Sequence, residues 1–168
     1  KQVNTSTSTN ILEIWHIEDG NNTLRWGQGV SLNNKNSTTW QYDGQEGGGH
    51  YARIDIHGSG NNFIGYQQNA GSTTGHLFTS LIFSDNNDIW VRQKNNGQKE
   101  LNLYTTSDGN TVEVLQKTNG GEHTANINLH GSQPTTLNLI QQGQTDKSYS
   151  ITQTCVTVGG CNISVHQQ

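Results

Sequence analysis

The chain has 168 residues, of which only 29% are hydrophobic, and it carries a formal net charge of −4. Because soluble domains normally contain roughly 45–50% apolar residues, a thick hydrophobic core is excluded. The acidic balance argues against a nucleic-acid partner, which favours a basic face. No apolar run approaches the ~20 residues that span a bilayer, so membrane insertion is not expected. Charged residues are only 13%, and short runs of Val, Ile and Leu recur throughout, which favours a thin, repetitive β-structure over a disordered chain.

The first residues, "KQVNTSTSTN", lack an apolar signal core and are predicted to form a flexible leader over 1–10. They are typical of a mature end that remains after removal of a targeting segment. Alternating segments then begin with "LEIWH" at 12–16, "STTWQ" at 37–41 and "FIGYQ" at 63–67. These are weak versions of a strand in which alternate residues share one face.

Clearer versions of the same strand follow, each ending in glutamine. They are "IWVRQ" at 89–93, "VEVLQ" at 112–116, "LNLIQ" at 137–141 and "ISVHQ" at 163–167. From Gln41 to Gln167 the successive glutamines lie 26, 26, 23, 25 and 26 residues apart. A second strand follows in most repeats after a Gly- or Asn-containing turn, and "GHYARIDIHGS" at 49–59 resembles "EHTANINLHGS" at 122–132. Repeats of 20–50 residues indicate a solenoid.

The predicted fold is therefore all-β: a flattened β-solenoid of about six and a half strand-turn-strand coils, with a ladder of inward glutamines. A single solenoid over 11–168 divides into approximate repeats 11–33, 34–59, 60–84, 85–107, 108–130, 131–153 and 154–168. Stacked glutamines at about 4.8 Å spacing can bond side chain to side chain along the axis. The predicted core ladder comprises Gln41, Gln67, Gln93, Gln116, Gln141 and Gln167, with Ile89, Val91, Val112, Val114, Leu137, Leu139, Ile163 and Val165.

This pattern of apolar-x-apolar-x-Gln, a Gly/Asn turn and a second alternating strand resembles the curlin repeat. The best matches are 112–129, 137–153 and 89–103, and within "LIQQGQ" Gln141 and Gly143 reproduce the glutamine-x-glycine element of that family. Curlin repeats form the subunits and nucleators of curli, which are bacterial extracellular amyloid fibres. The resemblance implies a secreted chain whose partner is a second copy of itself, along with other fibre subunits or matrix polysaccharide.

Seven histidines raise the question of a metal site. His50 and His123 share a predicted column, as do His57 and His130, but three coils separate the members of each pair. At roughly 4.8 Å per coil this is about 14 Å, too far for one ion. No metal and no cofactor is predicted.

An exposed aromatic stripe is predicted from the position just before each column glutamine, which faces outward. Trp15, Trp40 and Tyr66 occupy it in the first three coils. Such a stripe could bind a carbohydrate or another surface, since exposed apolar patches often mark interaction sites. The alternative is that these rings shield coils with weak inner faces, and a register slip of one residue would turn Trp40 inward.

Cys155 and Cys161 flank "VTVGG" and could close a small ring over the last turn. A disulfide here is worth roughly 2–3 kcal/mol in the loop-entropy account and fits an extracellular location. Free thiols with a redox or metal role are the alternative.

The sequence contains no G-x-S-x-G, H-E-x-x-H or phosphate-loop motif in a suitable setting, so no enzyme and no catalytic residue is predicted. The expected function is end-to-end self-assembly into extracellular fibres of a biofilm matrix, for adhesion and cohesion. Two alternatives stay open: a monomeric or capped surface- or carbohydrate-binding adhesin that uses the stripe, and an accessory nucleator. An ice-binding solenoid is less favoured because no regular Thr column appears.

Overall fold

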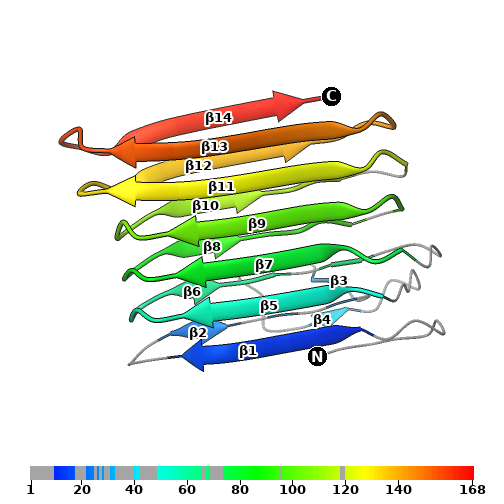
Figure 1. Ribbon diagram of the computed structural model, residues 1–168, viewed down its shortest axis with the longest axis horizontal. Coiled ribbons are helices and arrows are strands. Elements are labelled where there is room, and N and C mark those ends of the chain that lie inside the picture. Colours follow the sequence, from blue (N-terminus) through cyan, green and yellow to red (C-terminus); the bar gives the residue numbers. More distant parts are fainter. Residues whose placement is uncertain are drawn as a thin grey trace.

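The repeats of the chain form two facing parallel sheets, and each coil contributes one strand to each sheet (Figure 1). A computed structural model describes residues 10–17, 22–24, 26, 28, 31–32, 40–41, 49–65, 67–68, 74–94, 96–117 and 120–168, and at 15–17, 31–32 and 40–41 it describes the backbone alone. All regular structure in these residues is β-strand. The predicted all-β, flattened β-solenoid with Gln ladders is therefore confirmed.

One sheet, called here the front sheet, has the strand order β1-β5-β7-β9-β11-β13. Every neighbouring pair in it is parallel and follows in chain order, as a solenoid requires. Its strands are β1 (Ile11–Ile17), β5 (Tyr51–Ile56), β7 (Leu77–Ile82), β9 (Lys99–Thr105), β11 (His123–Gly131) and β13 (Lys147–Cys155).

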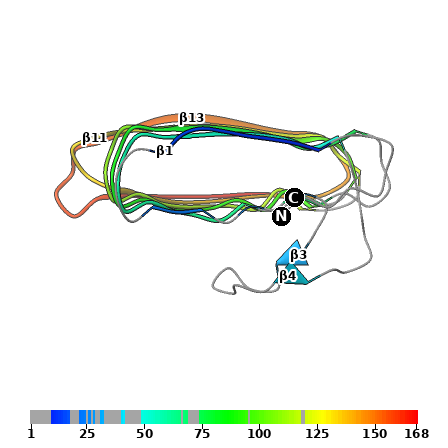
Figure 2. The same cartoon turned by 90° about the horizontal axis from the view of Figure 1, so that it is seen from below.

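The other sheet, the back sheet, has the order β14-β12-β10-β8-β6-β2 and is also parallel throughout. Its strands are β2 (Thr23–Leu24), β6 (Asn62–Phe63), β8 (Asp88–Trp90), β10 (Thr111–Val114), β12 (Thr135–Gln141) and β14 (Cys161–Gln167). Most of them end two or more residues before the column glutamine, and only β12 and β14 include it. Seen along the stack, the two sheets form the long sides of a flattened ring (Figure 2).

The core is the narrow space between the sheets, and alternate residues of both sheets fill it. In β9 the burial pattern alternates strictly, with Leu101 and Leu103 buried between partly exposed neighbours. Because facing sheets lie only about 10 Å apart, a few side chains per coil suffice to fill the interior. This explains how a chain with few apolar residues forms an ordered structure. The predicted core residues with at most 1% exposure are Ile89, Val91, Val112, Val114, Leu137 and Leu139.

The predicted coil 34–59 is wrong in its first half. Trp40 and Gln41 form β4 (Trp40–Gln41), which pairs antiparallel with β3 (Ser31–Leu32). This two-stranded sheet lies outside the flattened ring, on the side of the back sheet (Figure 2). Gln41 is therefore not a member of the parallel stack.

The first back strand comes instead from "NTLRWGQ" at 22–28, with β2 at its start. Thr23 and Leu24 pair in parallel with Asn62 and Phe63 of the next coil. The segment matches the template Asn-x-apolar-x-apolar-x-Gln that later back strands follow, with Trp26 and Gln28 at its last two inward positions. The repeat spacing did not predict this segment, because the interval from Gln28 to Gln67 is 39 residues, well above the usual repeat.

The strand at 11–17 was predicted to be a glutamine-type strand, and this is also wrong. It is β1 of the front sheet, where Leu12 pairs with Ala52 and Ile14 with Ile54. An irregularity follows between Ile14 and His16, which shifts the register by one residue. With 11–17 in the front sheet and 40–41 outside the stack, the described strands make six complete front–back pairs.

Candidate functional site

A ladder of glutamine side chains runs along the core, through four successive coils. Gln67, Gln93 and Gln116 each donate from Nε2 to Oε1 of the glutamine one coil earlier, at 2.8, 2.6 and 2.6 Å. The first acceptor is Gln28, which is fully buried. Each of the three donors also bonds to a main-chain oxygen of the front sheet, at Tyr51, Leu77 and Glu100. The ladder therefore ties adjacent coils together and joins the two sheets.

The direction of the ladder reverses after the fourth member. Gln141 Nε2 donates toward the C-terminal end, to Gln167 Oε1 at 2.8 Å. As a result the Oε1 atoms of Gln116 and Gln141 are buried without a hydrogen-bond partner. Among the residues predicted for the ladder, the structure thus joins Gln67, Gln93 and Gln116 in one run and Gln141 with Gln167 in another.

A second ladder, of asparagines, lies at the opposite corner of the coils and was missed by the sequence analysis. Asn61, Asn87 and Asn110 stand just before the back strands and are at most 1% exposed. Each of their main-chain N–H groups donates to the Oδ1 atom one coil earlier, at 2.8–3.0 Å. Thr135 N continues the series by donating to Asn110 Oδ1 at 2.8 Å. The usable sequence signal was an Asn six residues before each of the column glutamines 28, 67, 93 and 116.

A third column precedes the front strands and contains histidines in adjacent coils. His50 Nδ1 accepts from the main-chain N–H of His76 at 2.9 Å, and His76 Nδ1 accepts from that of Lys99 at 3.2 Å. Asn10 Oδ1 likewise accepts a hydrogen bond from the main-chain N–H of His50 at 3.0 Å. Both rings are buried, and their centroids lie 5.0 Å apart.

Burial sets the ionisation of these histidines. Desolvation and, second, the nearby His76 lower the pKa of His50 from 6.5 to about 3. Desolvation also lowers the pKa of His76 to about 4, with Lys99 as a further charge that disfavours protonation. Both rings are therefore neutral near pH 7, as a ring must be if Nδ1 is to accept a hydrogen bond.

Lys99 continues this column with a buried amine. Its Nζ donates to four main-chain oxygens at 2.8–3.1 Å, those of Asn96, Gly97, Gly120 and Gly121. Burial lowers the pKa of Lys99 to about 8. The amine joins the turns of two coils, which compensates part of the cost of desolvating a charge.

The histidines that lie next to each other in the structure are not the pairs that the sequence suggested for a metal site. His50 has a neighbour in the next coil, His76, whereas His123 lies beyond Lys99 in the same column. Among the described residues, no group of three or more His, Cys, Asp or Glu side chains is arranged to hold a metal ion.

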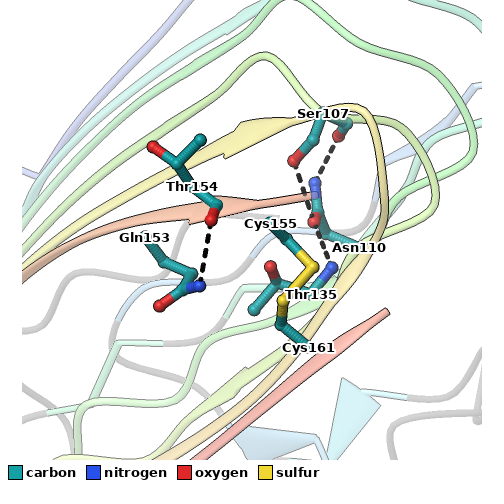
Figure 3. Close-up of a disulfide and its surroundings, with 7 residues drawn as sticks. All are labelled: Ser107, Asn110, Thr135, Gln153, Thr154, Cys155 and Cys161. Carbon is teal, nitrogen blue, oxygen red and sulfur yellow. Dashed lines mark hydrogen bonds between the residues drawn. A yellow bond between two sulfur atoms is a disulfide. The ribbon is translucent and has the colours of Figure 1, made fainter. Parts of the chain in front are cut away.

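Cys155 and Cys161 are joined by a disulfide across the turn between β13 and β14 (Figure 3). Cys155 pairs in register with Gly131, and Cys161 with Thr135, the residue that ends the asparagine ladder. In an earlier coil the corresponding corner is closed by hydrogen bonds between Ser107 and Asn110. A covalent bond thus replaces side-chain hydrogen bonds at the last corner.

The predicted aromatic stripe does not form one row in the described residues. Trp15 lies in β1 of the front sheet, Trp40 lies in β4 outside the stack, and Tyr66 falls outside the described residues. The prediction that Trp15 and Trp40 occupy one column is therefore wrong, because Trp40 pairs antiparallel with Leu32 outside the stack.

An aromatic row does exist, along the end of the front strands. His57 stacks on Phe83 with ring centroids 4.4 Å apart, and Phe83 meets Tyr104 edge-on at 6.2 Å. Tyr104 in turn contacts the ring of His130 at 5.2 Å. Phe83 is 48% exposed, so the row is open to solvent. We call these four residues the aromatic row.

Beside the aromatic row, the outer face of the front sheet has a shallow hollow of about 520 Å³. Side chains from four successive front strands line it, including Arg53, Asp55, Asn102, Tyr104 and Asn126. Arg53 donates to Asp55 Oδ2 from Nε and Nη2 at 3.2 and 2.8 Å. Tyr104 belongs to both features, so hollow and aromatic row form one continuous surface.

β13 and β14 form the C-terminal end of the described stack. β13 and β14 are the last strands of their sheets, and each has a paired neighbour on one side only among the described strands. Their inward residues Tyr149, Ile151, Ile163 and Val165 are partly exposed, although they pack against the core cluster. Their counterparts one coil earlier, such as Ile127 and Leu139, are at most 1% exposed. The difference arises because, among the described strands, none covers β13 and β14 on their outer side.

No protein-family model, no curated protein and no solved structure matches this chain. The described residues also contain no helix long and apolar enough to cross a membrane. The class that the fold defines is a β-solenoid with parallel sheets and internal glutamine and asparagine ladders.

Proposed function

We propose that this chain is a secreted structural protein that assembles end to end into extracellular fibres of the curli type, as part of a biofilm matrix. The observation that carries the proposal is the pair of long strands, β13 and β14, that have a neighbour on one side only among the described strands. β13 has nine residues and β14 has seven, and neither contains proline. Long edge strands without proline are templates for pairing with another chain.

The side chains at this end also favour the addition of another coil. Ile151 and Ile163 lie in apolar columns that are fully buried one coil earlier. A further coil would remove their remaining apolar surface from water, which stabilises by roughly 25 cal/mol per Å². Gln167 stands at the end of the glutamine column, where its amide can bond to the next glutamine.

The N-terminal end offers a matching edge. β1 is the first strand of the front sheet and runs parallel to all the others. Ile14 lies in the column of Ile54 yet is 44% exposed. If β1 of one copy paired with β13 of another, the parallel order of strands would continue. The exposed side chains of Ile14 and Ile151 would then both be covered. Such a head-to-tail contact is heterologous and does not close, so it gives a filament.

An accessory nucleator that meets a fibre at one end only is the second candidate. It is favoured by the irregular N-terminal part, where β1 has a register shift after Ile14 and the hairpin β3–β4 interrupts the repeat. The C-terminal coils are regular by comparison, since β12 pairs with β14 over seven consecutive residues. Growth from the C-terminal end alone would distinguish this role from that of the main subunit.

The proposal can be tested on neighbouring residues of one strand. Val165 faces the core at the C-terminal end of the stack, and Ser164 faces outward. Val165→Lys should abolish filament growth, as measured by light scattering, because it places a charge in the buried contact between copies. Ser164→Lys is the matched control and should retain growth. Equal growth of the two variants would contradict the proposed contact.

A further inference from the structure

The hollow on the front sheet contains a carboxylate oxygen without a partner. Asp55 is only 6% exposed, and its Oδ2 accepts from the Arg53 guanidinium. Its Oδ1 is buried and has no hydrogen-bond partner. A buried, unsatisfied acceptor is costly, so a donor that reaches it gains more than an ordinary surface hydrogen bond. The Arg53 side chain, which also lines the hollow, is 48% exposed.

Planar amides extend the polar part of the hollow along the stack. Asn126 Nδ2 donates to Asn102 Oδ1 at 2.7 Å, and Asn102 Nδ2 donates to Thr79 Oγ1 at 2.6 Å. Each amide uses one N–H group in this row and keeps a second for a ligand. The mutual bonds hold both side chains in place, which lowers the entropy lost when a ligand binds.

The aromatic row supplies the apolar part of the same surface. The ring of Tyr104 borders the hollow, and the half-exposed ring of Phe83 extends from it. His57 stacks on Phe83, and His130 contacts Tyr104 edge-on, so both rings of the pair have a neighbour along the row. Exposed flat rings beside fixed amides and a carboxylate suit a ligand with apolar C–H faces and hydroxyl edges.

We infer that the hollow and the aromatic row bind a linear neutral oligosaccharide. A pyranose ring presents a C–H face that can pack on Tyr104 or Phe83, and its hydroxyls can donate to Asp55 and accept from the Asn102 and Asn126 amides. The sugar chain lies across the front strands, because the lining comes from four successive coils. A net charge of −4 favours a neutral glycan over an acidic one. This site goes beyond fibre assembly and does not depend on it.

The test is binding of freshly purified, unassembled protein to soluble linear polysaccharides of glucose, mannose or galactose, measured by affinity electrophoresis and calorimetry. Tyr104→Thr, Phe83→Thr and Asp55→Asn should each weaken binding by about tenfold or more, the usual loss at a residue that dominates an interface. Ile140→Thr is the matched control. Ile140 lies in β12 of the back sheet at an outward position, away from the hollow, so this variant should bind as the parent chain does.

Circular dichroism and thermal unfolding separate loss of the site from loss of the fold. A folded Tyr104→Thr chain that loses binding supports the inference, whereas a folded one that binds at full strength overturns it. The inference is also overturned if the parent chain binds none of the three polysaccharides, or if Ile140→Thr weakens binding as much as Phe83→Thr. None of these outcomes depends on filaments, so the result is independent of the assembly experiment.

Discussion

The Trp26 indole occupies the space that a side chain at Gly65 would need. A Cβ atom at position 65 would lie 1.8 Å from Trp26 Cε3, and Gly65 has φ of +133°. Trp26 itself is only 4% exposed and packs on Phe63 and Phe78, with ring centroids 6.0 and 5.0 Å away. A large ring in one coil is thus accommodated by glycine in the next. The weak apolar content of "FIGYQ" is thereby explained.

Gly65→Ala should lower the free energy of unfolding by about 2–4 kcal/mol, because overpacking adds to the cost of a positive φ. Gly109→Ala is the control, since Gly109 also has a positive φ of +70° but its Cβ would meet Pro134 at an ordinary 3.6 Å. Denaturant unfolding measures both. Equal losses would mean that the Trp26 contact contributes nothing.

Gln93 is the third member of the four-residue glutamine run, so its loss should separate Gln116 from Gln28 and Gln67. Gln93→Leu leaves Gln67 Oε1 without its donor and Gln116 Nε2 without its acceptor. Stability should fall by about 2–3 kcal/mol, as expected for buried groups left unsatisfied. The exposed Gln144 gives the control Gln144→Leu, which should change stability little. An unchanged unfolding midpoint for Gln93→Leu would contradict a stabilising ladder.

The buried histidines predict a loss of stability in acid. The pKa values of His50 and His76 are lowered from 6.5 to about 3 and about 4 in the folded chain. Below pH 6.5 the unfolded chain therefore binds protons that the folded chain does not. The contribution of the two histidines to stability is full above pH 6.5 and falls as the pH decreases toward 4, by up to roughly 1.4 kcal/mol per pH unit for each histidine.

His76→Asn separates this effect from the titration of carboxylates. An asparagine at this column position can accept the same main-chain hydrogen bond, as Asn10 does from His50 N, and it does not titrate. The variant should show a shallower decrease in stability between pH 6.5 and 4 than the parent chain. Identical pH profiles in urea unfolding would show that His76 is not the source.

The disulfide should stabilise the last coil locally. Reduction, or the double substitution of Cys155 and Cys161 by serine, should cost about 2 kcal/mol for a ring of this size. Hydrogen exchange should increase in β13 and β14 first, since these strands flank the bond. Uniform acceleration in all strands, with β13 and β14 no faster than β9, would contradict a local role.

The sequence pattern predicts the fold where the repeats are regular, and fails where a distant residue decides the structure. Alternation alone predicts the back strands that precede Gln93 and Gln116 and those that end at Gln141 and Gln167. Alternation alone does not predict that Gln28 belongs to the glutamine ladder. An insertion separates it from Gln67, and the space for Trp26 depends on Gly65 in the next coil.

The asparagine column was not predicted, and the histidine column was predicted only at His50 and His123, for a related reason. Asn87 and His76 are ordinary turn residues in local sequence, and their importance lies in hydrogen bonds to residues 23–26 positions away. The Trp15–Trp40–Tyr66 stripe was wrong because the hairpin β3–β4 removes Trp40 from the stack. The aromatic row at Phe83 and Tyr104 arises only once the coils are in register.

End-to-end assembly can be examined by cryo-electron microscopy of the purified chain after incubation at neutral pH. We expect unbranched filaments with a repeat of about 4.7–4.8 Å, in which β13 and β14 of one copy continue in parallel into β1 and β2 of the next. Filaments joined through the outer faces of the sheets, or chains that stay monomeric, would contradict it.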